Sequence, residues 1–187
     1  MRLLVGMQAR APELRRRPLF WQLLPRLMAV GLGSGTFAAT PAANDVWIDL
    51  NVGSKHSEKS YVWQGRTQSF NEANWGLGAT YGLRDWCDVK AGWFENSYDK
   101  TSLYVLVNPK WELSPRSHWS VAPGFALGLV SGYQHTPERT AAVAPWGMLT
   151  LSLGFNERWR VNLGYIPSRL FVSNSIDVAT LQLSIKL

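Results

Sequence analysis

The sequence predicts an all-β protein, an eight-stranded antiparallel transmembrane β-barrel, and three observations support this prediction. The chain closes on a strand in which apolar and polar residues alternate, with one face made by Leu181, Leu183, Ile185 and Leu187. Segments of about ten residues with the same period-two pattern recur upstream. An arginine-rich, apolar segment stands at the N-terminus. Such strands suit a barrel whose apolar outer face meets lipid and whose more polar inner face lines a lumen.

The first segment, residues 1–38, has the composition of a signal peptide. Arg15, Arg16 and Arg17 precede an apolar run, and small residues follow it around Ala38. Proline and polar residues interrupt the run, which makes it a poor membrane-spanning helix, and an amphipathic anchor helix is the alternative interpretation. We expect cleavage between residues 38 and 43, which leaves residues 44–187 as the barrel.

Eight alternating segments are expected to form the strands. They lie near residues 45–56, 71–83, 86–96, 101–112, 117–132, 144–155, 158–167 and 177–187. In the clearest of them, Leu149, Leu151 and Leu153 alternate with Thr150 and Ser152. An even number of antiparallel strands is what a single-chain bacterial outer-membrane barrel requires.

The connections between these segments alternate in length, which predicts the orientation of the barrel. Those at residues 84–85, 114–116 and 156–157 are short, whereas those at 57–70, 133–143 and 168–176 are long. Short periplasmic turns and long external loops are typical of barrels in the outer membrane of Gram-negative bacteria. The ten tryptophans include several near segment ends that fit aromatic girdles, namely Trp93, Trp111, Trp119, Trp146 and Trp159. A soluble lipocalin-like barrel is disfavoured, because its outer face would be polar.

Charge and cysteine content exclude several classes of function. The net charge of +6 comes mostly from residues 1–43, which carry six arginines and one glutamate, so the remainder of the chain has a net charge of only +1. Nucleic acid is therefore not an expected partner. The single cysteine, Cys87, allows no intramolecular disulfide. No metal-binding spacing is present, and we expect neither a metal nor a cofactor.

Small residues occupy the predicted inner face of two strands. They include Gly76, Gly78 and Thr80 in one segment and Ala126 and Gly128 in another. A small barrel is normally filled by its own side chains. Inward glycines either leave room for a ligand or let neighbouring strands approach and bend, and the pattern favours neither explanation over the other.

Two residues from different strands are predicted to meet at the long-loop rim. His56 ends the first segment, and Ser97 follows the third, next to Asn96. A histidine and a serine in contact can serve as base and hydroxyl in acyl transfer. Isolated residues at a rim are more often solvated loop side chains, so this juxtaposition is a weak indication by itself.

The order of short motifs resembles the lipid A palmitoyltransferase (PagP) family of outer-membrane enzymes. Residues 70–78, Phe-Asn-Glu-Ala-Asn-Trp-Gly-Leu-Gly, are similar to the family's Tyr-Asn-Glu-Arg-Pro-Trp-Gly-Gly-Gly. Residues 94–98, Phe-Glu-Asn-Ser-Tyr, are similar to its Phe-Lys-Asp-Ser-Trp. Residues 128–130 with Pro145, and residues 165–167, Tyr-Ile-Pro, resemble its fifth to seventh strands. The four places occur in the family's order over roughly residues 46–187.

This resemblance implies a site and a reaction. The family moves a palmitoyl chain from a glycerophospholipid to lipid A, and it holds the chain in an apolar hollow inside the barrel. The resemblance places its catalytic residues at His56, Asn96 and Ser97, with asparagine where the family has aspartate. It implies an acyl pocket at Asn108, which stands where the family has a glycine, and at Gly76, Gly78 and Gly128. It also implies lateral lipid access beside Pro145 and Pro167.

The sequence therefore predicts a monomeric outer-membrane acyltransferase with a phospholipid donor and lipid A as acceptor. His56 would be the general base, Ser97 the nucleophile or a donor to the oxyanion, and Asn96 would orient His56 or add to oxyanion stabilisation. A lipid A deacylase and a non-catalytic barrel with a degenerate site are the alternatives. Asn96 is central to the last of these, because an amide orients an imidazole but does not stabilise its charge as a carboxylate does.

Overall fold

The computed structural model describes residues 44–113, 118–134, 142–168 and 176–187. The predicted signal peptide and its cleavage region lie outside the described residues. Ten strands form within them: β1 (Val46–His56), β2 (Ser60–Trp63), β3 (Arg66–Ser69), β4 (Gly76–Arg84), β5 (Cys87–Glu95), β6 (Thr101–Pro109), β7 (Trp119–Ser131), β8 (Val143–Phe155), β9 (Trp159–Ile166) and β10 (Val178–Lys186). None of the described residues belongs to a helix long and apolar enough to cross a membrane.

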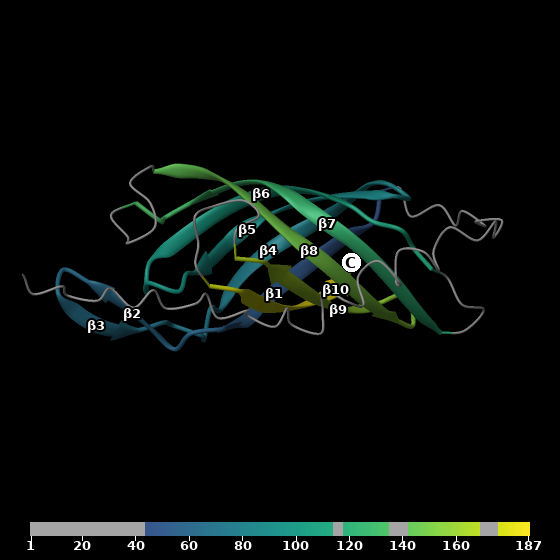
Figure 1. Ribbon diagram of the computed structural model, residues 1–187. Helices are drawn as coiled ribbons and strands as arrows, with labels where there is room; N and C mark the ends of the chain where they lie inside the picture. Colours follow the sequence, from purple (N-terminus) through teal and green to yellow (C-terminus); the bar gives the residue numbers. More distant parts are fainter. Residues whose placement is uncertain (1–43, 114–117, 135–141, 169–175) are drawn as a thin grey trace, which may run out of the picture. The chain divides into compact units, whose positions relative to one another are not determined.

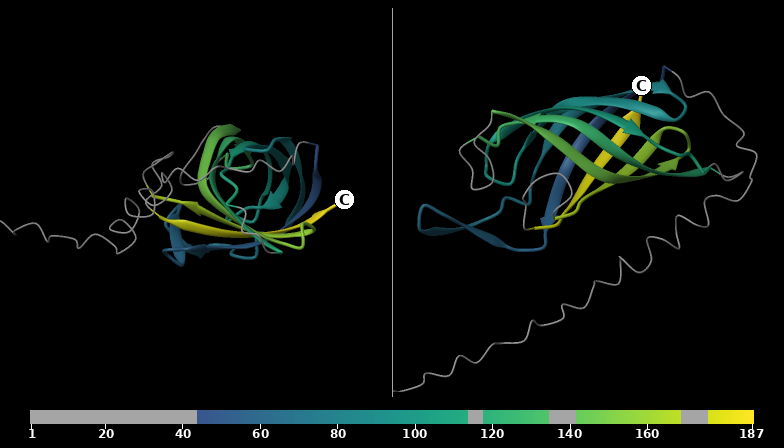
Figure 2. Two further views of the ribbon diagram at one scale, coloured as in Figure 1. Left: turned by 90° about the vertical axis from the view of Figure 1, so that its right-hand side faces the viewer. Right: turned by 45° about the horizontal axis from the view of Figure 1, so that its top comes forward.

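Eight of these strands close into one antiparallel barrel, as the alternating segments predict (Figures 1 and 2). The order around the barrel is β1-β10-β9-β8-β7-β6-β5-β4, so β1 pairs with both β4 and β10. Because β1 and β5 both run antiparallel to β4, they end at the same rim. We call the end where β1 and β5 finish the long-loop rim and the opposite end the short-turn rim.

The predicted loop over residues 57–70 contains structure that the alternation did not reveal. Strands β2 and β3 form a hairpin separate from the barrel sheet. Gln64 and Gly65 connect them with positive φ angles, the conformation that a tight two-residue hairpin turn requires. The Tyr61 ring of this hairpin lies 4.9 Å from the rings of Phe70 and Tyr98, which ties the hairpin to the long-loop rim.

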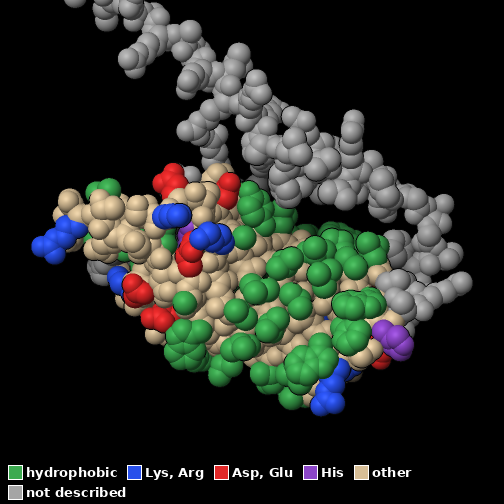
Figure 3. Space-filling model, turned by 90° about the horizontal axis from the view of Figure 1, so that it is seen from below, with side chains coloured by type: hydrophobic (Ala, Val, Ile, Leu, Met, Phe, Trp, Pro, Cys, Tyr) green, Lys and Arg blue, Asp and Glu red, His purple; other side chains and the backbone are tan. Residues whose placement is uncertain are grey.

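The outer face of the barrel is apolar. Exposed side chains of this face include Ile48, Leu50, Leu77, Leu103, Val105, Leu129, Leu163 and Leu183, and Figure 3 shows how densely such side chains cover one side of the molecule. Trp111, Trp119 and Trp159 are exposed near strand ends, as expected for girdle residues. Trp146 is an exception, because the alternation of β8 turns it inward, where its ring lies 5.4 Å from that of Tyr133.

Polar and charged side chains fill the interior near the short-turn rim. The Lys110 ammonium donates to both carboxylate oxygens of Asp88, at 2.9 and 2.8 Å, and Arg160 lies 3.8 Å from the same carboxylate. The Arg160 guanidinium also stacks 3.7 Å above the ring of Trp47. Charged groups persist inside a barrel when they are paired and hydrogen-bonded in this way.

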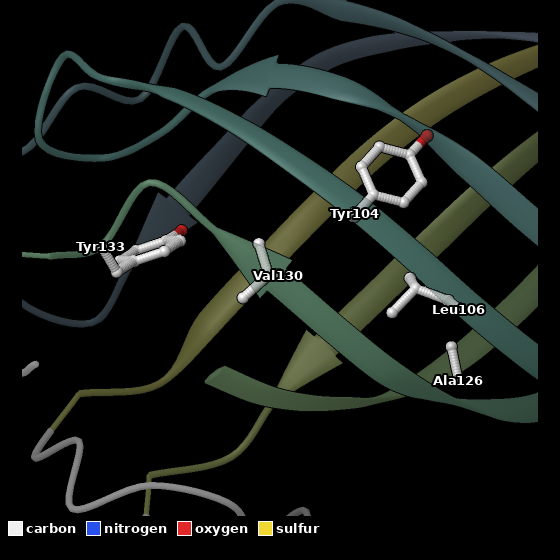
Figure 4. Packing of buried hydrophobic residues seen from close by; sticks show 5 residues of the cluster. All are labelled: Tyr104, Leu106, Ala126, Val130 and Tyr133. Atoms are coloured by element: carbon white, nitrogen blue, oxygen red, sulfur yellow. The ribbon is translucent and has the colours of Figure 1, made fainter. Parts of the chain in front are cut away.

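Apolar side chains gather toward the long-loop rim. Tyr104 and Leu106 of β6 pack with Ala126 and Val130 of β7 and with Tyr133 just beyond it (Figure 4). The interior therefore divides into a polar half at the short-turn rim and a largely apolar half at the long-loop rim. The candidate site lies in the apolar half.

Candidate active site at the long-loop rim

The folded chain brings His56 and Ser97 into contact. His56 is the last residue of β1, and Ser97 lies two residues beyond the end of β5. Their side chains meet because both strands finish at the same rim, and the distance from His56 Nε2 to Ser97 Oγ is 2.7 Å. His56 is only 6% exposed, so this contact is formed away from bulk water.

Two residues of the segment before β4 hold the His56 ring. Phe70 stacks on the imidazole with the ring centroids 4.5 Å apart and the planes 9° from parallel. Glu72 accepts a hydrogen bond from the His56 backbone N–H at 3.3 Å, and the same carboxylate oxygen lies 3.9 Å from Nδ1. Nδ1 is buried and has no hydrogen-bond partner among the described residues. Glu72 is thus the carboxylate that faces the side of the ring opposite Ser97.

Glu72 is itself held by Lys55. The Lys55 ammonium donates to Glu72 Oε2 at 2.6 Å. This hydrogen bond, together with the one from the His56 backbone, lowers the pKa of the Glu72 carboxyl, so it remains ionised beside the histidine. Sequence reasoning did not single out Glu72, although it lies within the motif at residues 70–78 that resembles the palmitoyltransferases. Its position in that motif was the available signal.

Asn96 has a different environment from the one expected of an orienting residue. Its Nδ2 donates to Ser102 Oγ and to the Gly132 carbonyl, each at 3.0 Å. Its Oδ1 accepts from the backbone N–H groups of Tyr98 and Lys100, at 2.9 and 3.2 Å. The amide has two N–H donors and two acceptor positions, and all four are therefore in use. Asn96 is completely buried and shapes the turn that carries Ser97, and none of its side-chain hydrogen bonds reaches His56.

A cavity of about 120 Å³ opens beneath the His56–Ser97 pair. Its apolar wall includes Tyr104, Leu106, Val130, Trp146, Met148 and Ile166. Toward the polar half of the interior the wall becomes hydrophilic, with Asn51, Lys90, Thr150, Asn162 and Gln182. The cavity therefore has an apolar wall near His56 and Ser97 and a polar wall at its inner end, which we call the floor.

Asn108 belongs to the wall of this cavity, where the resemblance placed it. It pairs across the sheet with Asp88 of the charged network, so it stands at the boundary between the two halves. Its Nδ2 donates to the Phe125 carbonyl at 3.0 Å and to Thr150 Oγ1 at 3.1 Å, which links β6 to β7 and β8.

The three glycines expected in the pocket serve the packing of the strands instead. A Cβ atom on Gly76 or Gly128 would lie 2.1 or 2.0 Å from a backbone carbonyl oxygen of the neighbouring strand, and one on Gly78 would meet the Tyr104 hydroxyl. The glycines that line the cavity are Gly53 and Gly164. Of the two explanations for inward glycines, close strand approach accounts for Gly76, Gly78 and Gly128.

Pro145 and Pro167, for which the resemblance implies lateral lipid access, lie near the point where the pairing between β8 and β9 ends. The pairs between β8 and β9 begin at Leu149–Tyr165, so residues 143–148 of β8 pair with β7 but extend past the last pair with β9. Pro145 lies within this extension, and Pro167 follows directly after the end of β9. A proline supplies no backbone N–H to a ladder, which suits both positions.

The described residues contain no group of three or more histidine, cysteine, aspartate or glutamate side chains placed to hold a metal ion.

Comparisons with known proteins bear on the fold. No protein-family model and no curated protein matches the chain. Among solved structures, one from the de novo design of transmembrane β-barrels is similar, with a TM-score of 0.54 and 12% identity over 78% of this chain and 97% of that chain. The outer-membrane enzyme PagL (TM-score 0.43, 15% identity, 76% and 99% coverage) and the N-terminal barrel domain of Pseudomonas aeruginosa OprF (0.40, 12%, 79% and 100%) are more distant. The first likeness shows that the chain has the fold of an eight-stranded transmembrane β-barrel.

Proposed function

We propose that this protein is an outer-membrane acyltransferase that moves a palmitoyl or similar chain from a glycerophospholipid to lipid A. The observation that carries the proposal is the 2.7 Å contact between His56 Nε2 and Ser97 Oγ at the mouth of a hydrocarbon-lined cavity. A base and a hydroxyl within hydrogen-bond reach are the core of acyl-transfer chemistry. The cavity beneath supplies the place for an acyl chain, and the sequence resemblance supplies the donor and the acceptor.

The reaction can be written with these two residues. Ser97 Oγ forms a bond to the ester carbonyl carbon of the phospholipid as its proton passes to His56 Nε2. The bond from this carbon to the glycerol oxygen breaks, and the glycerol oxygen takes the proton. A lipid A hydroxyl then gives its proton to Nε2 and attacks the acyl-serine, and Ser97 recovers its proton on leaving. In the direct route, the lipid A hydroxyl gives its proton to His56 Nε2 and attacks the phospholipid ester itself, while Ser97 donates a hydrogen bond to the oxyanion. The bond to the glycerol oxygen then breaks, and that oxygen takes the proton from His56.

Glu72 and Asn96 take separate roles in this proposal. Glu72 stabilises the imidazolium that forms on His56, because its carboxylate lies 3.9 Å from Nδ1. Asn96 is a positioning residue: its four hydrogen bonds fix the turn that holds Ser97 in contact with His56. An asparagine at this position is therefore compatible with activity, because a carboxylate from another segment faces the ring.

The barrel also offers a route and a limit for the acyl chain. Residues 143–148 of β8 lie beyond the last pair of β8 with β9, and this edge beside Pro145 and Pro167 would let a lipid chain pass laterally from the membrane into the cavity. Asn108, at the boundary with the charged half, would set how deep the chain can reach. The proposed location is the outer membrane of a Gram-negative bacterium, where the protein would act as a monomer; the apolar outer face of the barrel and the alternating loop lengths support the location.

Mass spectrometry of lipid A tests the proposal. Lipid A from cells that express the protein should carry one more acyl chain than lipid A from cells that lack it, and Ser97→Ala should abolish the gain. Loss of a chain would indicate a deacylase that uses water as acceptor. No change, with the protein folded in the outer membrane, would indicate a barrel without this chemistry. Detection of an ester on Ser97 would distinguish the covalent route from direct transfer.

A further inference from the structure

The floor of the cavity contains a buried lysine without an ionic partner. Lys90 of β5 is 6% exposed and belongs to the cavity wall. Its one hydrogen bond goes to the amide oxygen of Gln182, at 2.9 Å, and no described carboxylate lies within 4.0 Å. An ammonium group has three N–H donors, so two of them remain for something else.

The nearby carboxylates are already engaged. Asp88 accepts two hydrogen bonds from Lys110. Asp49 accepts one hydrogen bond on each oxygen, from Thr80 and Ser184. The polar half of the interior thus contains two carboxylates and three basic side chains, namely Lys90, Lys110 and Arg160. Lys90 is the one of the three that contacts no carboxylate among the described residues. With all five groups ionised, this network has one positive charge in excess, and Lys90 lies where the network borders the cavity.

The Tyr104 hydroxyl is a second hydrogen-bond donor near Gln182, the residue that accepts from Lys90. The Tyr104 hydroxyl is buried and has no hydrogen-bond partner among the described residues. The amides of Asn51 and Gln182 are its polar neighbours. Figure 4 shows the Tyr104 ring on β6 with its hydroxyl directed away from Leu106. A buried hydroxyl without a partner costs free energy, and a ligand that accepts from it would remove that cost.

We propose that the cavity binds a long-chain carboxylate, of the free fatty acid type, with its carboxylate on Lys90 and Tyr104 and its hydrocarbon chain directed toward His56. The match is one of charge and of hydrogen bonding: the floor offers two ammonium N–H donors, one hydroxyl donor and an unbalanced positive charge. The wall above is apolar, as an alkyl chain requires. Burying a carboxylate is favourable only when a counter-charge and additional hydrogen bonds replace its water, and both are present here.

This site is distinct from the proposed acyl transfer. A chain that is being transferred would have its carbonyl at Ser97 and its methyl end toward the floor, whereas the carboxylate described here lies at the floor. The two ligands would occupy the same cavity in opposite orientations. The binding experiment below requires no enzymatic turnover, so its outcome and that of the lipid A assay are separable.

Palmitate binding to the protein purified from membranes in a neutral detergent tests the charge match. Affinity would be measured by titration calorimetry for the wild type, Lys90→Met, Tyr104→Phe and the surface control Lys59→Met. Loss of a hydrogen bond to a charged group predicts palmitate binding weaker by about 10–100-fold in Lys90→Met and by about tenfold in Tyr104→Phe. Lys59→Met should bind as the wild type does. Methyl palmitate, which has no charge, should lose much less affinity than palmitate does in Lys90→Met.

The orientation of the bound chain gives an independent readout in the wild-type protein, which keeps the test valid if Lys90→Met fails to fold. Stearate with a nitroxide near its methyl end should broaden the NMR signals of the His56 imidazole. Stearate with a nitroxide near its carboxylate should broaden the side-chain amide signals of Gln182. The reverse pattern, or palmitate affinity unchanged in a folded Lys90→Met, would overturn the proposal.

Discussion

The two halves of the barrel interior are built from the same strands but differ in how their polar groups are satisfied. Near the short-turn rim, Asp88, Lys110 and Arg160 form ion pairs within the wall. Near the long-loop rim, His56 and Ser97 contact each other beside an apolar cavity, and Nδ1 of His56 has no hydrogen-bond partner among the described residues. In the first half, ion pairs offset much of the cost of burying these charges. The second has the His56–Ser97 pair, a cavity and polar atoms without partners among the described residues, which a ligand would use.

The largest expected effect is on catalysis in the cavity half. His56→Ala and Ser97→Ala should each lower acyl transfer by about 10²–10⁴-fold, since each removes the general base or the hydroxyl. The double variant should be little worse than either single variant, because residues that act as a unit are not additive. Rates in detergent with a defined phospholipid and lipid A would measure this. Near-normal rates in both single variants would exclude the pair as the site.

Breaking the ion pair of the charged half should reduce stability instead. Lys110→Met leaves the Asp88 carboxylate buried without its main counter-charge, which should lower the free energy of unfolding by about 3–5 kcal/mol. The double variant Asp88→Asn with Lys110→Met should recover much of that loss. Urea titration of folding into lipid bilayers would provide both values. A single variant as stable as the wild type would show that the pair contributes nothing to stability.

Two exposed apolar positions, one on the outer face of the barrel and one on the separate hairpin, should respond differently to a charge. Leu183 lies on β10 and Val62 on the β2–β3 hairpin, which is separate from the barrel sheet. Arginine at Leu183 should cost about 2–4 kcal/mol, because the side chain would face lipid. Arginine at Val62 should change stability by about 0.5 kcal/mol or less, as at an ordinary surface position. Equal costs in the same bilayer titration would mean that the apolar band is assigned incorrectly.

Asn96→Asp distinguishes a positioning residue from an orienting one. A carboxylate cannot donate to Ser102 Oγ and the Gly132 carbonyl, so the turn should lose about 1–3 kcal/mol of stability. Acyl transfer should fall with it, because Ser97 would be displaced. If Asn96 instead oriented His56 directly, the carboxylate would preserve or raise activity and shift the pH–rate profile upward. Hydrogen exchange at residues 96–100 and the rate profile would separate these outcomes.

The smallest effect should come from Glu72→Gln. Removal of the carboxylate beside His56 Nδ1 makes the imidazolium less favourable, so the acidic limb of the pH–rate profile should move to lower pH. The maximal rate should fall by only about tenfold, because Glu72 is partly exposed and solvent screens its charge. Glu58→Gln, at an exposed position between β1 and β2, serves as a control for the loss of one negative charge. A profile that does not move would remove Glu72 from the mechanism.

Alternation along each strand was sufficient to predict the barrel, because a residue's face follows from local backbone geometry. The eight predicted segments correspond to the eight barrel strands, and the two predicted faces of β1 agree with its alternately exposed and buried residues. Three predicted inward residues of β8 line the cavity, namely Met148, Thr150 and Ser152. The contact of His56 with Ser97 was also accessible, because antiparallel strands with known turns place both at one rim. Trp146 shows the limit of composition, because a tryptophan near a strand end was expected in a girdle but faces inward.

The sequence by itself therefore determined the fold class, the strand count and the pairing of a histidine with a serine at one rim. Only the tertiary structure decided that Glu72 faces His56, that Asn96 shapes the Ser97 turn, that Gly76, Gly78 and Gly128 serve close strand packing, and that Lys90 lies at the cavity floor without an ionic partner. These features depend on the register and stagger with which eight strands close around a common interior. Register sets which inward side chains share a level, and a period-two pattern carries no information about neighbours that lie across the barrel.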